Sequence, residues 1–426
     1  MKSWLKFVQP SLLAVAVAVV FVACDEQLDS GAACPALCPQ PAAVLNDTTF
    51  FAVDLDTSIA GYPTQGSEPQ FFIASMGDTL QTRAIVRFDS LPQVFRHINS
   101  ATDSSIYAVD TGAVVQFHVV SIDTTGAPTT LDVYDVDMYG AEDSDPNAVT
   151  AAFTPDRLLG SKTFPAAKMI DSILSVPIDR DKLLAKIQTD TPANRLRIGV
   201  AVSGSGKSSI SIYSREGGFA PVLQFRPSTD TTVSIVGQAP HSMTPTEDFV
   251  RASLTDYLVV AKSPPDPPAD VLRVGSLPAR RVYLRFNIPS HILDSSSVVR
   301  ASLILTQRPN GFSPQSRDTV SLRPLLISAS PTIVDVQKVL LFLNPISADS
   351  MKAVPADSGL RAFELISLIR AWRATTADKT PRAVALASLR EGLSGSLVDF
   401  YSIEAPAAVR PRLRITYVPR QSSGLP

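Results

Sequence analysis

Alternating apolar and polar residues recur in short blocks along most of the chain. Alternation with a period of two predicts half-buried β-strands. Proline in sheet proteins is largely confined to edges, turns and loops, so the 34 prolines of this chain indicate many strand ends. Together these features predict an all-β fold of antiparallel sandwiches. The blocks cover residues 85–88, 114–120, 131–136, 196–202 and 210–213 in the first half, and 282–286, 301–305, 383–387 and 413–417 in the second.

Two segments break this alternation with helical spacing. Residues 179–189 carry Leu183, Leu184 and Ile187, and residues 362–374 carry an apolar stripe that ends in Trp372. Each segment comes just before the strand pair that closes its half. We therefore expect each helix to cap one end of a sandwich with its stripe buried. Trp372 fits either this core or a ligand-stacking role.

The two halves are copies of one pattern. The first contains RAIVRFD at Arg83–Asp89, and the second contains RVYLRFN at Arg281–Asn287. Each is followed much later by a Tyr-Ser-x-Glu motif, at Tyr213–Glu216 and Tyr401–Glu404, and then by a strand opened by proline, PVLQF or PRLRI. The offset is roughly 190–200 residues, about one domain length. The chain therefore contains two tandem copies of one domain.

The N-terminus has the features of an export signal. Lys2 and Lys6 precede an apolar run over residues 12–23, which is shorter than the ~20 residues needed to span a bilayer but suits a signal-peptide core. The run ends in Phe21-Val-Ala-Cys24, which resembles a bacterial lipobox, although leucine is usual at position 21. In a lipobox Cys24 is lipidated and begins the mature protein. An ordinary secretory signal with a chance cysteine is the alternative.

Lipidation of Cys24 would anchor the protein to a membrane without spanning it. We expect a lipid-anchored protein of the cell envelope, in the outer membrane, on its periplasmic or surface face. The acidic stretch at residues 25–29 resembles a surface-export tag of some Gram-negative lineages. An aspartate directly after the cysteine also resembles an inner-membrane retention signal, so the leaflet stays open.

Two further cysteines, Cys34 and Cys38, lie in a Pro/Ala-rich stretch. Disulfides persist in oxidising compartments, so we expect a small disulfide loop or two idle thiols. A metal site would need more ligands. The expected organisation is a lipoprotein signal peptide at 1–23, a flexible tether at 24–44, β-sandwich domains at 45–227 and 228–419, and a tail at 420–426.

These motifs together resemble the DNRLRE-type domain of secreted bacterial proteins. The resemblance rests on Arg-Phe-Asp/Asn before a proline-bearing turn, on Ser297–Leu305, on a late helix ending in Ala-Trp, and on Tyr-Ser-x-Glu followed by the proline-opened strand. It covers most of residues 46–419 and is closer in the second half. It implies two jelly-roll β-sandwiches related to carbohydrate-binding modules. No ligand residues carry over, because the matching motifs are structural.

Charge and motifs narrow the function classes. The net charge is −2 with scattered basic residues, which argues against nucleic acid because phosphate binding needs a clustered basic surface. The GSGKS run at residues 204–208 fits a relaxed phosphate loop, but an alternating strand pattern follows where a helix is required. A loop between two strands explains it better.

Acidic side chains cluster at residues 132–145. Carboxylates in a loop suit Ca²⁺, which takes six to eight oxygens, so this stretch is a candidate for a structural calcium site. A solvated strand edge and turn is the alternative, and the spacing is not that of an EF-hand. The candidate ligands are Asp132, Asp135, Asp137, Asp143 and Asp145.

We expect no enzymatic activity. The four histidines are isolated, and no nucleophile elbow or metal-ligand spacing is present. The leading hypothesis is non-catalytic binding or adhesion, with polysaccharide as ligand and stacking aromatics as contacts. The alternatives are a scaffold that binds an envelope protein and, third, a polysaccharide-degrading enzyme. The candidate aromatics, each equally compatible with the core, are Tyr134, Tyr139, Tyr213, Tyr283 and Tyr401.

Overall fold

A computed structural model describes most of the 426 residues, and residues Leu45–Pro426 form one compact unit. The described residues are 44–60, 65–96, 104–106, 113–122, 128–138, 141–165, 172–188, 194–204, 206–226, 235–242, 254–275, 277, 279–312, 318–327, 343–374 and 382–419. Cys24, Cys34, Cys38 and Tyr139 lie outside them.

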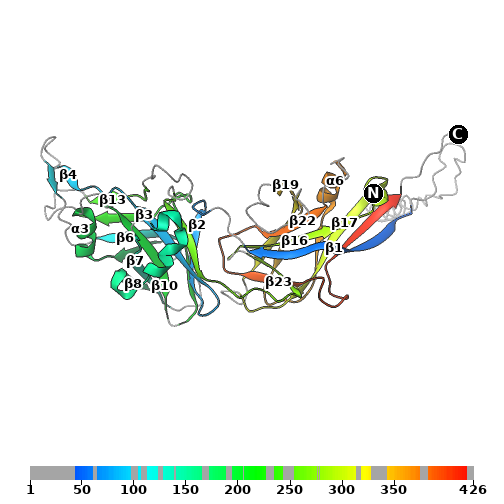
Figure 1. The fold of residues 1–426 in the computed structure, drawn as a ribbon, viewed down its shortest axis with the longest axis horizontal. Coiled ribbons are helices and arrows are strands. Elements are labelled where there is room, and N and C mark those ends of the chain that lie inside the picture. Colours follow the sequence, from blue (N-terminus) through cyan, green and yellow to red (C-terminus); the bar gives the residue numbers. More distant parts are fainter. Residues whose placement is uncertain are drawn as a thin grey trace, which may run out of the picture. The chain divides into compact units, whose positions relative to one another are not determined.

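The fold is all-β, as the alternating patterns predict, and consists of two curled antiparallel sheets that form two sandwiches (Figure 1). The first sheet runs β13-β12-β6-β11-β2-β3-β10-β7-β8, with β14 on β3 and β9 on β6. Its strands are β2 (Gln70–Ser75), β3 (Gln81–Phe88), β6 (Val114–Ile122), β7 (Thr129–Asp135), β8 (Leu158–Phe164), β9 (Ile173–Pro177), β10 (Leu196–Ser203), β11 (Ser208–Tyr213), β12 (Val222–Phe225), β13 (Val236–Gln238) and β14 (Asp256–Lys262).

The second sheet runs β1-β24-β17-β23-β15-β16-β22-β18-β19, with β20 on β18 and β21 on β17. Its strands are β1 (Asn46–Ala60), β15 (Val271–Gly275), β16 (Arg280–Phe286), β17 (Ser296–Arg308), β18 (Val320–Ile327), β19 (Leu343–Ser347), β20 (Met351–Ala353), β21 (Gly359–Glu364), β22 (Ala383–Ser388), β23 (Leu397–Tyr401) and β24 (Arg412–Pro419). A separate hairpin pairs β4 (Val94–Arg96) with β5 (Ser104–Ile106).

The two copies exchange their first strands. The RAIVRF strand β3 pairs with β14 of the second copy, where Asp256 lies opposite Val86. The equivalent RVYLRF strand β16 pairs with β1 of the first copy, where Asp56 lies opposite Leu284. Figure 1 shows β1, in blue, among the yellow and orange strands of the second sandwich. Residues from β2 to β14 thus form the first sandwich without interruption, and the second is built from β1 together with β15–β24.

The expected domain boundary between residues 227 and 228 remains a prediction. The strand pairing places β1 in the second sandwich and β14 in the first. The chain passes between the sheets twice, once after β1 and once between β14 and β15. The second passage is the proline-rich segment at 263–269. Two arginines of the second sandwich hold this segment. Arg273 Nη1 of β15 donates to the carbonyl of Pro265 at 2.8 Å, and Arg280 of β16 forms an ion pair with Asp266.

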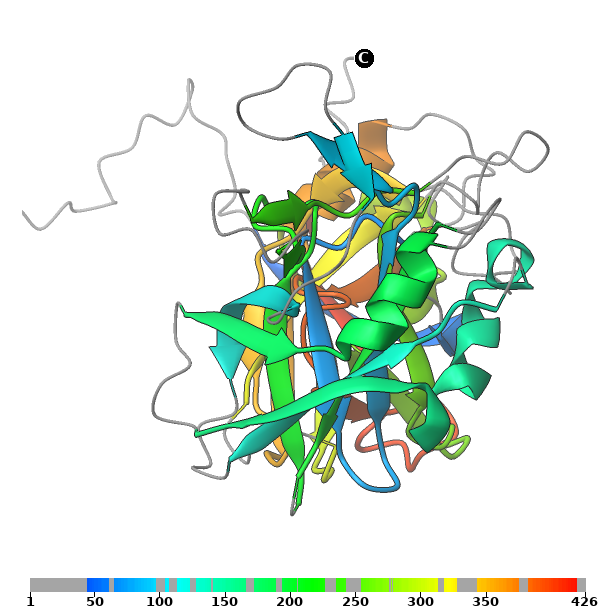
Figure 2. The same cartoon turned by 90° about the vertical axis from the view of Figure 1, so that its left-hand side faces the viewer.

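Both expected capping helices are present, and each buries its apolar stripe. Leu183 and Ile187 of α3 (Arg180–Gln188) lie fully buried in the core of the first sandwich. Figure 2 shows α3, in green, against the strands of that sandwich. In the second sandwich α6 (Ile366–Ala374) buries Trp372 in the core. Trp372 is therefore a packing residue, which was the first of its two expected roles.

The second helix begins later than the sequence pattern suggests. Residues 362–364 end strand β21, which pairs with β17 over Ser302–Gln307. Phe363 is buried from this strand, and the N–H of Leu365 still bonds to the carbonyl of Ala301 at 2.7 Å. An apolar run that passes from a buried strand end into a helix has no break in hydrophobicity to mark the boundary.

Short helices complete the fold. In the first half these are α2 (Ala141–Ser144) and the 3-10 helices η1 (Pro146–Ala152) and η2 (Pro155–Arg157), and in the second half α4 (Ser290–Leu293). Val149 and Ala152 of η1 pack on the outer face of β3 and β14, against Ile85 and Tyr257. The first sandwich therefore closes this outer face with its own chain.

Candidate functional site

The Tyr-Ser-x-Glu motif holds the exchanged strands in place. In the first copy the N–H of Arg215, the x residue, donates to Asp256 Oδ2 of β14 at 2.8 Å. In the second copy the N–H of Ile403 donates to Asp56 Oδ2 of β1 at 2.7 Å. Both acceptors are aspartates of a strand that belongs to the other copy. The motif is thus a structural clamp, which explains why it recurs in both halves.

The motif serine fixes the chain that enters the next strand. Ser214 Oγ donates to the carbonyl of Glu68, and Ser402 Oγ donates to the carbonyl of Ala269 at 2.9 Å. The backbone N–H of each serine binds the carbonyl one residue further on, at 3.3 and 3.0 Å. The equivalent serines of the two motifs therefore each fix one of the two segments in which the chain passes between the sheets.

Carboxyl groups collect at these clamps. Burial raises the pKa of Asp256 to about 7 despite the N–H of Arg215, and the neighbouring Glu216 and Glu68 raise it further. Burial also raises the pKa of Glu68, while the N–H groups of Gly66 and Ser67 lower it. Burial raises the pKa of Asp56 to about 6, against the N–H of Ile403. Both exchanged strands therefore carry an aspartate that favours its protonated form.

An aromatic cluster lies on the outer face of the first sandwich. The ring of Phe219 stacks on His118 of β6 with centroids 5.1 Å apart and planes at 28°. It also meets Tyr213 of β11 at 5.2 Å and 56°. Phe219 is 53% exposed, and so is Ile173, which lies opposite His118 in the β6–β9 pair. We call Phe219, His118 and Tyr213 the aromatic cluster.

The turn after β11 places Phe219 on this face. Gly218 has a φ of +86°, a left-handed conformation that favours glycine. A Cβ on Gly217 would lie 2.1 Å from the carbonyl oxygen of Pro69 and 2.7 Å from Cδ1 of Tyr213. The two glycines therefore let the turn fold tightly over Tyr213, so that the following phenylalanine returns to the ring of His118.

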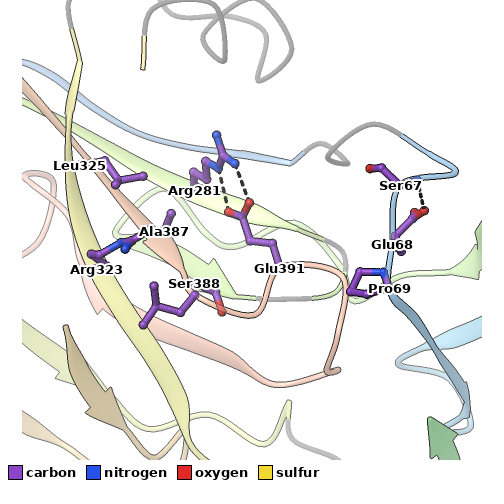
Figure 3. Close-up of a pocket in the computed structure, with 10 residues that line it drawn as sticks. Ser67, Glu68, Pro69, Arg281, Arg323, Leu325, Ala387, Ser388 and Glu391 are labelled. Carbon is purple, nitrogen blue, oxygen red and sulfur yellow. Dashed lines mark hydrogen bonds and ion pairs between the residues drawn. The ribbon is translucent and has the colours of Figure 1, made fainter. Parts of the chain in front are cut away.

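A cavity of about 320 Å³ lies beside the second sandwich (Figure 3). Arg281 donates from Nε and Nη2 to the two carboxylate oxygens of Glu391, at 2.7 and 2.6 Å. Arg323 of β18 also faces the cavity, and its Nε is buried without a hydrogen-bond partner among the described residues. The full lining is Ser67, Glu68, Pro69, Arg281, Arg323, Leu325, Ala387, Ser388, Leu389 and Glu391.

The acidic stretch at 132–145 is held largely by basic and hydroxyl side chains. Asp137 pairs with Arg195 at 2.7 Å, and Lys186 reaches Asp135 at 2.9 Å. Asp132 accepts hydrogen bonds from two serine hydroxyls, both at 2.6 Å. Asp145 caps η1 through the N–H of Asn147.

The sequence offered a candidate calcium site in this stretch, and it favoured a loop between two strands over a phosphate loop for the GSGKS run. Over the described residues, no group of three or more His, Cys, Asp or Glu side chains is arranged to hold a metal ion. The calcium site remains a prediction, and the side chain of Asp143 lies outside the described part. The GSGKS run joins strands β10 and β11, so the explanation as a loop between strands is confirmed.

The candidate tyrosines have different surroundings. Tyr283 is fully buried, and Tyr134 packs against Phe153 with centroids 5.1 Å apart. Tyr401 is half-buried beside the guanidinium of Arg308, 5.9 Å from its ring centroid. Only Tyr213 joins an exposed aromatic neighbour among those described.

The sequence interpretation missed Phe219 and Arg323. Phe219 follows a pair of glycines outside every alternating block, and this GGF turn directly after Tyr-Ser-x-Glu was the available signal. Arg323 lies in β18, whose pattern is interrupted by Pro324. Proline usually argues against an interior strand.

Comparisons with known proteins leave the family open. No protein-family model and no curated protein matches the chain. One similar solved structure is that of the Macrobrachium rosenbergii nodavirus, 8% identical over 91% of this chain and 93% of that chain, with a TM-score of 0.15. Another is the tandem CBM22-1-CBM22-2 domain of Xyn10C from Paenibacillus barcinonensis, 10% identical over 87% and 98%, with a TM-score of 0.13. Both scores are too low to carry an argument, and the resemblance to DNRLRE-type domains stays a prediction.

Membrane anchorage through Cys24 also remains a prediction from the sequence, because Cys24 lies outside the described residues. Among the described helices, none is long and apolar enough to cross a bilayer.

Proposed function

We propose that this protein is a non-catalytic, lipid-anchored envelope protein that binds polysaccharide through the aromatic cluster of the first sandwich. The observation that carries the proposal is the half-exposed ring of Phe219, held between His118 and Tyr213. A fixed aromatic ring offers a large apolar face at little cost in conformational entropy, and Tyr and His add polar edges. Such a surface suits a sugar ring, which has an apolar face and polar hydroxyls.

Among the residues that the structure describes, only those of the first sandwich form this cluster. At the equivalent Tyr401 the neighbour is the charged Arg308, and no exposed phenylalanine follows the motif in the segment Ala405–Arg410. We therefore propose one aromatic binding surface per chain, with the second sandwich contributing support or a different contact. The lipobox-like segment at Phe21–Cys24 is the basis for the proposed lipid anchor, which would hold this surface at the envelope.

The test is retention of the purified protein on a panel of insoluble and immobilised polysaccharides, compared with Phe219→Ala. We expect selective retention of the wild type and at least a tenfold loss of affinity in the variant, about 1.4 kcal/mol. Phe51→Ala is the matched control, because Phe51 is also a half-exposed phenylalanine at 45%. Equal retention of the Phe219 variant, or no retention of the wild type on any glycan, would overturn the proposal in favour of a protein partner.

Incorporation of labelled palmitate tests the anchor separately. Loss of the label in Cys24→Ser supports lipidation, and an unlabelled wild type contradicts it.

A further inference from the structure

Strand β1 is joined to the first sandwich only by a short length of chain. Nine residues, 61–69, lead from β1 in the second sandwich to β2 in the first. The opposite passage, from β14 in the first sandwich to β15 in the second, has eight residues, 263–270. Two passages of nearly equal length that run in opposite directions make the chain an internal pair, in which each copy gives its first strand to the other.

Strand β1 fills a gap in the second sheet. Its residues Asn46–Phe51 pair with β24, and its residues Ala52–Ala60 pair with β16. Without β1, each of these two strands would present an uncovered edge on this side, and uncovered edges promote association with other strands. We call the gap bounded by β16, β24 and the clamp at Ile403 the β1 socket.

The side chains of β1 that are held in the socket contact the second sandwich. Leu55 and Ile59 pack against the cluster around the buried Tyr283, and Asp56 Oδ2 accepts the N–H of Ile403 at 2.7 Å. These contacts involve β1 and the second sandwich, and they leave open which molecule the strand comes from. A β1 strand from another copy of the chain would make the same contacts.

The first sandwich contains an equivalent socket that is filled from the other copy. There β13 pairs with β12 and β14 pairs with β3, and Asp256 Oδ2 accepts the N–H of Arg215 at 2.8 Å. The chain therefore already fills one type of socket with two strands that arrive by different connections. Exchange of an identical element between molecules is a low-cost route to a dimer, because the contacts of the element are kept.

We propose that two molecules of this protein associate by exchanging β1, so that each β1 fills the socket of its partner. Reciprocal exchange fills both sockets, whereas exchange in one direction leaves β16 and β24 uncovered in one molecule. The product is therefore a closed dimer with two-fold symmetry. By mass action, folding at high protein concentration favours it over the single chain. The inference goes beyond the proposed function and requires neither glycan binding nor the lipid anchor.

A disulfide between two differently tagged full-length chains, produced in the same cells, tests the exchange. Thr49 of β1 and Arg414 of β24 are exposed and lie directly opposite one another, and such strand neighbours have Cα atoms close enough for a disulfide, at roughly 4.5–5.5 Å. One chain carries Thr49→Cys and the other carries Arg414→Cys. In both chains serine replaces the native cysteines, Cys24, Cys34 and Cys38. We expect a disulfide that joins the two tags and a species with twice the mass of one chain in light scattering.

The matched control uses a strand pair that the exchange does not involve. Thr130 of β7 and Thr163 of β8 are also opposite neighbours, with their hydroxyl oxygens 2.8 Å apart, and both remain in the first sandwich of their own chain. Thr130→Cys in one chain and Thr163→Cys in the other should give at least tenfold less joined product. A single chain that carries both Thr49→Cys and Arg414→Cys shows that the socket positions can form the disulfide, and circular dichroism shows that each variant is folded.

The proposal predicts that the joined product depends on the socket pair. If the single chain with both cysteines forms its disulfide while the mixed chains form none, β1 stays in its own molecule and the proposal is wrong. Equal yields from the socket pair and the control pair would show random collision of thiols and would also contradict it.

Discussion

The exchanged strand β14 should make stability fall as pH rises. Asp256 is 1% exposed, and its pKa is raised to about 7 from an ordinary value of 3.8, chiefly by burial. The folded protein therefore binds more protons than the unfolded chain between these two values. By linkage, the free energy of unfolding decreases across this window, and the contribution is fully present only below about pH 4.

The magnitude follows from the size of the shift. About three pKa units, at roughly 1.4 kcal/mol each, correspond to about 4 kcal/mol lost between pH 4 and pH 8. Asp256→Asn keeps an oxygen for the N–H of Arg215 and cannot ionise. We expect the variant to match the wild type near pH 4 and to exceed it by up to about 4 kcal/mol at pH 8.

Urea unfolding followed by circular dichroism from pH 4 to pH 8.5 measures this difference. Asp78→Asn is the control, because Asp78 is fully exposed and pairs with Lys262 at the other end of the same strand. The free energy of unfolding of Asp78→Asn should not rise relative to that of the wild type as pH increases. A variant at Asp256 that is destabilised equally at all pH values would show that the hydrogen bond, and not the buried charge, dominates at this position.

Three further outcomes follow from the structure. Asp56→Asn should show the same sign over the narrower window of about pH 4–6, since the pKa of Asp56 is raised to about 6, and the same urea series measures it. Arg197→Gln should cost about 3–5 kcal/mol in urea unfolding, because Arg197 forms buried ion pairs with Asp89 and Glu142 and its loss removes the positive charge between these two carboxylates; an unchanged midpoint would contradict this. Leu183→Ala should cost about 2–5 kcal/mol by leaving a cavity under α3, whereas Leu184→Ala, at a partly buried neighbour, should cost less.

The sequence predicted those features that depend on local pattern. Strands β3 and β16 carry alternation that survives in both copies, and α3 carries a helical stripe whose buried members are Leu183 and Ile187. The sequence did not reveal which strand pairs with which. Asp56 and Asp256 are equivalent in the repeat, so each would satisfy the clamp of either copy. Pairing then depends on how the chain passes between the sheets, which no local pattern records.

The candidate site residues likewise differ in how far the sequence alone reveals them. Tyr213 was among the five candidate tyrosines because aromatics are visible in a sequence, but its role depends on Phe219, which a turn of two glycines brings back to the sheet. Arg323 and Glu68 are far apart in the chain and line one cavity only because residues 67–69, just before β2, lie against the second sandwich. Contacts made across such a passage have no sequence signature.

The strand exchange also predicts where the chain can be divided. The first sandwich runs unbroken from β2 to β14, so a fragment of residues 65–262 retains every strand of its sheet. A fragment of residues 45–227, cut at the repeat boundary, loses β14 and leaves the edge of β3 and the buried Tyr257 site unfilled. An uncovered edge strand promotes aggregation. We therefore expect residues 65–262 to give a monomeric fragment with cooperative unfolding, and residues 45–227 to aggregate or remain unfolded, as measured by gel filtration and circular dichroism. The complementary test joins Ala60 to Val271 by a short linker, which keeps β1 on β16 and β24 and should yield a folded second sandwich. If residues 45–227 fold cooperatively while residues 65–262 do not, the first strand of each copy belongs to its own sandwich and the exchange is wrong.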